Sequence, residues 1–81
     1  MDSPYKALGF RHMAYMENQY GIRIYPGHRI DDWCVVIPKS LVKKKYPSYP
    51  CDQSYAVYLI TESEALKIAE EWTNFAKKLE A

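Results

Sequence analysis

The chain has 81 residues, of which 48% are hydrophobic and 15% aromatic, with eight tyrosines. A chain of this length is expected to fold as one domain, residues 1–81, that removes roughly 60% of its unfolded surface from water and leaves little room for a large catalytic cleft. Eleven Lys and Arg residues against ten Asp and Glu residues give a formal net charge of +1. Affinity for nucleic acid or for an anionic membrane must therefore come from a local cluster of charge.

The first residues, "MDSPYKALGF", lack the positive charge and the apolar run of a secretory signal. No stretch of the chain approaches the roughly 18 apolar residues that are needed to span a membrane. These features predict a soluble, cytoplasmic protein that makes no membrane contact. Two cysteines, Cys34 and Cys51, could form one disulfide, but a reducing compartment favours free thiols.

The segment 4–17 carries signals for both a helix and a strand. Ser3 followed by Pro4 resembles a helix cap with proline at the first helical position, whereas Gly9 weakens any helix that continues past it. The tetrapeptide "NQYG", which begins at Asn18, suits a type I turn closed by a left-handed glycine. This turn favours a strand over "GFRHMAYME" that pairs with the next strand, and the helical alternative stays open.

Three further segments have the alternation typical of strands, namely "YGIRIYPG", "DWCVVIP" and "SYAVYLI". In the first, Ile22 and Ile24 share one face, while Arg23 and Tyr25 share the other. The second ends at Pro38, because proline cannot donate to a strand ladder. The third is apolar on both faces, which predicts a central strand of the sheet.

The last segment, "ITESEALKIAEEWTNFAKKLEA", has the clearest helical pattern. Thr61 and Glu64 form a capping box at its start. One apolar stripe then follows at steps of three and four residues, and it comprises Ala65, Ile68, Ala69, Trp72, Phe75, Ala76 and Leu79. The predicted fold class is therefore α+β, a small antiparallel sheet of three to four strands with one C-terminal amphipathic helix packed on one face.

Residues that could carry chemistry are scattered along the chain. His12, His28, Cys34 and Cys51 form no C-x-x-C or H-x-x-x-H pair, so the sequence predicts no metal site. The loop "PGHRIDD" collects acidic and basic side chains, as a solvated turn does, and no glycine-rich phosphate loop is present. These features predict a protein that is not an enzyme and that uses no cofactor.

The long connection between the last two strands contains "LVKKKYPSYPCDQSY", in which "KSLVKKKY" is expected to form a short helical turn. Its lysines and tyrosines allow three interpretations. The tyrosines could pack back on the sheet beside a solvated turn, the segment could bind a protein, or it could bind unpaired bases. Three lysines are few, because nucleic-acid binders often place about six or more cations along one face.

The succession of "GIRIYP", "DWCVVIP", "YAVYLIT" and "SEALKIAEEW" looks like small bacterial and phage proteins whose last strand runs into a T-x-x-E-A helix start. Over residues 21–76 it also resembles, distantly, the three-strand-plus-helix DNA-binding modules of phage integrases. In those modules Arg and Lys stud the sheet face, whereas here that face shows mainly Arg23.

Small size, near-neutral charge and the absence of catalytic motifs predict a small non-enzymatic accessory factor or inhibitor, of the kind that phages and mobile elements carry. It is expected to act by contact with another protein. The predicted contact residues are Lys43, Lys44, Lys45, Tyr46, Tyr49, Arg23 and Tyr25. The alternative is a nucleic-acid-binding module that uses the Lys43 to Tyr49 loop. Unpaired strand edges and surplus tyrosines are also compatible with a symmetric homodimer.

Overall fold

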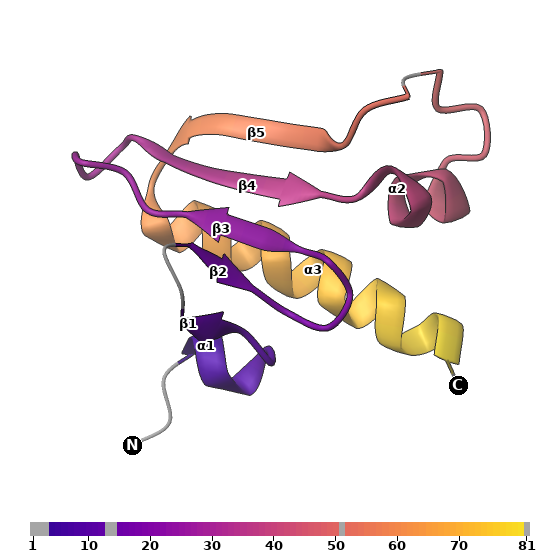
Figure 1. The fold of residues 1–81 in the computed structure, drawn as a ribbon, viewed down its shortest axis with the longest axis horizontal. Helices are drawn as coiled ribbons and strands as arrows, with labels where there is room; N and C mark the ends of the chain where they lie inside the picture. The colour runs from indigo at the N-terminus through magenta and orange to yellow at the C-terminus, as the bar shows by residue number, and fades with distance from the viewer. Residues whose placement is uncertain (1–3, 13–14, 51, 81) are drawn as a thin grey trace.

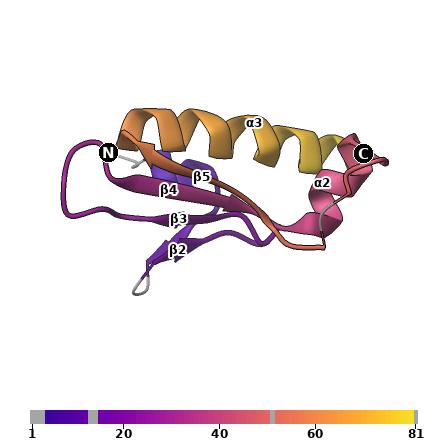
Figure 2. The ribbon, with the colours of Figure 1, turned by 90° about the horizontal axis from the view of Figure 1, so that it is seen from above.

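The computed structural model describes residues 4–12, 15–50 and 52–80. Five antiparallel strands form a meander in the order β1-β2-β3-β4-β5, and the long helix α3 lies across one face of it (Figures 1 and 2). The α+β fold class is thereby confirmed. In chain order, the elements are α1 (Pro4–Ala7), β1 (Arg11–His12), β2 (Met16–Glu17), β3 (Arg23–Tyr25), β4 (Trp33–Ile37), α2 (Lys39–Lys45), β5 (Tyr55–Ile60) and α3 (Glu62–Glu80).

The N-terminal segment contains both predicted structures. Pro4 opens α1, and Gly9, with a φ of +80°, follows the helix where its N–H donates to the Lys6 carbonyl over 3.0 Å. The strand predicted over "GFRHMAYME" is divided into β1 and β2, which pair with each other. The sheet therefore has five strands, one more than the upper number predicted. Ser3, the predicted helix cap, lies outside the described residues.

The turn between β2 and β3 has the predicted geometry. The Gly21 N–H donates to the Asn18 carbonyl over 3.0 Å, and Gly21 has a φ of +81°. Glycine is favoured there because a side chain in the left-handed region meets the backbone. The turn fixes a register in which Met16 faces Ile24 and Glu17 faces Arg23.

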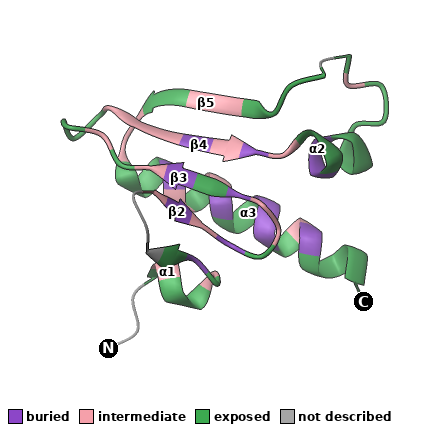
Figure 3. Cartoon of the chain, viewed as in Figure 1, coloured by how far each residue is buried: buried purple, intermediate pink, exposed green. Residues whose placement is uncertain are grey.

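The core lies between α3 and the inner face of the sheet (Figure 3). Small side chains on α3, namely Ala65, Ala69 and Ala76, allow the helix to approach the strands closely. The stripe predicted for the helix is rotated slightly in the structure. Thr73 is completely buried, whereas Leu79 at the end of the stripe is exposed. The same core contains fully buried isoleucine and valine side chains from β3, from β4 and from the residue before β3, namely Ile22, Ile24, Val35 and Ile37.

The prediction that "SYAVYLI" is a central strand is wrong. β5 pairs only with β4 and forms one edge of the sheet. Only Thr61 separates β5 from α3, and the helix turns back over β4 and β3 instead of over β5. The apolar residues on both sides of β5 are therefore only partly covered, and Tyr58 and Leu59 are 68% and 76% exposed.

Candidate functional site

Helix α2 holds the lysine segment against the core. Leu41 and Val42 are buried, while the lysines of its last turn, Lys43 to Lys45, all face solvent. The helix starts directly after Pro38, whose carbonyl accepts from the Leu41 N–H over 3.0 Å. The short helical turn predicted from "KSLVKKKY" is thus confirmed, and the apolar pair in its middle explains why it is fixed in place.

Two of these lysines have contacts within the chain. The Lys45 Nζ atom lies 5.0 Å from the ring centroid of Trp72, 5.6 Å from that of Phe75 and 5.8 Å from that of Tyr46. This distance range is typical of cation–π attraction. The Lys43 Nζ atom lies 3.9 Å from a carboxylate oxygen of Asp52, an exposed pair that contributes little stability.

Beside Lys45 the surface is hollowed into a pocket of about 340 Å³, which we call the aromatic pocket. Its walls come from α2, from the loop that follows, from the first residue of β5 and from the middle of α3. The rings of Tyr46 and Trp72 meet edge to face with centroids 6.4 Å apart. The lining consists of Val42, Lys45, Tyr46, Tyr49, Tyr55, Glu71 and Trp72.

The aromatic pocket combines rigid and adaptable groups. Trp72 is only 8% exposed and belongs to the core, whereas Tyr46 and Tyr55 are 54% and 42% exposed and free to contact a ligand. Lys45 supplies a positive charge and Glu71 a negative charge to the same opening. This arrangement suits an apolar group flanked by polar or charged ones.

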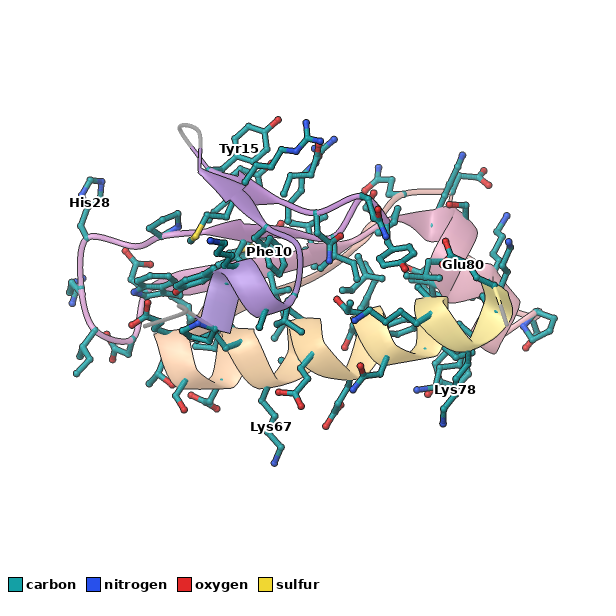
Figure 4. The ribbon with its side chains drawn as sticks, turned by 90° about the horizontal axis from the view of Figure 1, so that it is seen from below. Phe10, Tyr15, His28, Lys67, Lys78 and Glu80 are labelled. Carbon is teal, nitrogen blue, oxygen red and sulfur yellow. The ribbon has the colours of Figure 1, made fainter. Side chains whose placement is uncertain are left out.

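Arg23 and Tyr25, the other two predicted contact residues, lie elsewhere. They sit on the face of the sheet that α3 does not cover, in the region where Tyr15 points away from the helix (Figure 4). There the Arg23 Nε atom donates to Glu17 over 2.6 Å, and the Tyr15 and Tyr25 rings have centroids 5.0 Å apart. Hydrogen bonds to Tyr25 and to Glu17 raise the pKa of Arg23, which keeps its positive charge. The seven predicted contact residues therefore form two separate groups.

The open face of the sheet also includes Cys34. It pairs with Tyr25 in the register and is half-buried on the face away from α3. It is a free thiol, and burial raises its pKa, which disfavours the reactive thiolate. Cys51, the other cysteine, lies outside the described residues.

Within residues 4–12, 15–50 and 52–80, no cluster of three or more His, Cys, Asp or Glu side chains could hold a metal ion. Over the same part of the chain, no helix has the length and apolar character needed to cross a bilayer. His28 is exposed in the loop between β3 and β4 (Figure 4).

Sequence reasoning identified Lys45, Tyr46 and Tyr49 but missed the rest of the aromatic pocket. Tyr55 was assigned to a strand, and Trp72 to the apolar stripe of the helix. The sequence did contain one indication of a pocket. Trp72 lies next to alanines on that stripe, and a large ring beside small side chains makes the helix surface uneven, so that it can form one wall of a pocket. Comparison of the chain with protein-family models, with curated proteins and with solved structures finds no match.

Proposed function

We propose that the protein is a small cytoplasmic accessory factor or inhibitor that acts by binding another protein, with the aromatic pocket as its main contact surface. One observation supports this above the others. Three tyrosines and a tryptophan, from three segments of the chain, surround one opening that also carries a lysine and a glutamate. Tyrosine and tryptophan are enriched at the energetic centres of protein interfaces, where they fill or form pockets.

The lysine segment supports a protein ligand better than a nucleic acid. Lys45 is directed to aromatic rings of its own chain, and Lys43 lies near Asp52. Glu71 adds a negative charge at the pocket, which would repel a phosphate backbone. A nucleic-acid-binding module remains the second candidate function, because Lys43 to Lys45 stand beside the half-exposed Tyr46 ring, on which a base could stack.

The test is capture of a binding partner from nuclease-treated lysate of the source cells, with a pocket variant and a matched control. Tyr46→Ser combined with Tyr55→Ser removes two exposed rings from the aromatic pocket, and urea unfolding checks that the double variant is still folded. Tyr58→Ser removes a more exposed ring that lies outside the aromatic pocket. We expect the wild type and Tyr58→Ser to retain the same stoichiometric partner, and the double variant to lose it. Retention by all three proteins would contradict the aromatic pocket as the contact surface.

A second measurement separates the two candidate functions. Single-stranded DNA and RNA oligonucleotides are titrated into the protein at low and at high salt, and binding is followed by fluorescence anisotropy. We expect no saturable binding. Binding that weakens steeply with salt, and that disappears when Lys43 and Lys44 are both changed to Glu, would favour the nucleic-acid function instead.

A further inference from the structure

The two edges of the sheet differ in how they are protected from pairing with another chain. Natural edge strands are usually short, charged or interrupted by proline. β1 follows this pattern, since it is two residues long and begins with the exposed Arg11. β5 does not follow it. It is six residues long, and residues 53–61, "QSYAVYLIT", contain no charged residue and no proline.

The inner face of β5 is also incompletely covered. Val35 and Ile37 of β4 have no exposed surface, because α3 crosses directly over them. Their β5 neighbours in the register are Val57 and Tyr55, which are half-buried and exposed, respectively. Figure 3 shows β5 coloured as exposed and intermediate along its whole length, beside the buried centre of β4. Apolar surface at this edge therefore remains in contact with water.

Only the first part of β5 is regular. Trp33 pairs with Ile60 and Val35 pairs with Val57, so β5 advances three residues where β4 advances two, which defines a β-bulge. Leu59 in this bulge has a φ of +57°, an uncommon conformation for a residue with a branched side chain. The bulge shifts the end of β5 out of its regular register with β4. Residues 55–58 are therefore the stretch that can pair with a further strand.

We infer that this edge binds a second copy of the chain, with β5 of each copy pairing antiparallel across a two-fold axis. A two-fold interface brings the same surface against itself, so it must carry no like charges that repel. The uncharged residues 53–61 meet this condition. The axis of such a pair is perpendicular to the sheet, so both α3 helices lie on the same side and the partly covered Val57 side chains come together between them.

The measurement is the mass of the full chain in solution by sedimentation velocity over a wide range of protein concentration. We expect the wild type to shift from the mass of one chain toward that of two as concentration rises. Tyr58→Lys places a charge on the exposed side of β5, twice in each dimer, and weakens association by about tenfold or more. Asn74→Lys makes the same change of charge on an exposed position of α3, and association stays as in the wild type.

Hydrogen exchange of the wild type gives a readout that does not depend on any variant. Backbone amides within residues 55–58 that do not pair with β4 should exchange slowly at high concentration and fast at low concentration. A wild type that keeps the mass of one chain at every concentration would overturn the proposed dimer. A dimer in which the exchange of these amides does not change would equally assign the interface to another surface. The aromatic pocket shares Tyr55 with this edge but not Tyr58, so Tyr58→Lys tests the dimer without changing a residue that lines the pocket.

Discussion

The Asn18 Nδ2 atom donates a hydrogen bond to the Oγ1 atom of Thr73 over 3.0 Å, and both side chains are buried. The same Nδ2 atom donates to the Leu8 carbonyl over 3.2 Å. On its other side, the Asn18 carboxamide oxygen accepts from the backbone N–H groups of Tyr20 and Ile22 over 3.1 and 3.2 Å. One side chain thus connects the segment after α1, the turn from β2 to β3 and the middle of α3.

Replacement of Asn18 by Ala should lower the free energy of unfolding by about 2–3 kcal/mol, because it leaves buried groups in three segments without their partner. Thr73→Val keeps the shape of the side chain and removes the acceptor, so a smaller loss of about 1–2 kcal/mol is expected. Asn74→Ala, at the exposed neighbouring position, is the control and should change stability by about 0.5 kcal/mol or less. Urea unfolding measures all three, and equal midpoints for Asn18→Ala and Asn74→Ala would refute the linking role.

The start of α3 offers a second test. The Thr61 Oγ1 atom accepts from the Glu64 N–H over 3.2 Å, and the Glu64 carboxylate accepts from the Thr61 N–H over 3.1 Å. Thr61→Ala should therefore cost about 1 kcal/mol, a decrease in melting temperature of about 5 °C for a domain of this size. Ser63→Ala changes an exposed residue of the same turn, and no such decrease is expected. Equal decreases in both variants would contradict the capping box.

Local features of this fold could be predicted because their determinants are close in sequence. The Thr61 capping box and the Asn18 to Gly21 turn each depend on residues three apart, and the structure confirms both. The buried face of α3 could similarly be predicted from the spacing of its apolar residues, except at Thr73. That residue interrupts an apolar stripe with a hydroxyl group, and its partner Asn18 is 55 positions away. A buried polar residue whose partner is so distant has no local signature.

The location of β5 and the shape of the aromatic pocket could not be predicted for a related reason. A strand that is apolar on both faces can lie at the centre of a sheet or at an edge that another molecule covers. Which of these two positions β5 takes depends on where α3 lies. The aromatic pocket likewise depends on the position of Trp72 relative to Tyr46 and Tyr55. Side-chain packing between elements decides both, and no pattern within one element records it.

In the loop between β3 and β4, position 27 requires glycine because there is no room for a side chain. A Cβ atom there would overlap the carbonyl oxygen and carbon of Asp32, so the backbone must move. Gly27→Ala should cost about 1–3 kcal/mol, as overpacking does. At Gly9 the nearest atom would be at 3.9 Å, and Gly9→Ala should cost about 1 kcal/mol through its positive φ alone. Thermal unfolding compares the two, and a Gly27→Ala variant as stable as the wild type would contradict the crowded loop.

The contact between α1 and the start of α3 predicts a loss of stability at alkaline pH. Burial, followed by the hydrogen bond to Glu62 and the charge of that carboxylate, raises the pKa of Tyr5 well above its ordinary value of about 10. Because the pKa is higher in the folded state, this stabilisation is fully present below about pH 10 and is lost as pH rises further.

Tyr5→Phe has no proton to lose, so its free energy of unfolding should decline less above about pH 10 than that of the wild type. Urea unfolding at about pH 8, 10 and 11 measures the difference, and Tyr58→Phe, which removes a hydroxyl group at an exposed position, is the matched control. Parallel curves for the wild type and Tyr5→Phe would show that Tyr5 does not couple folding to pH.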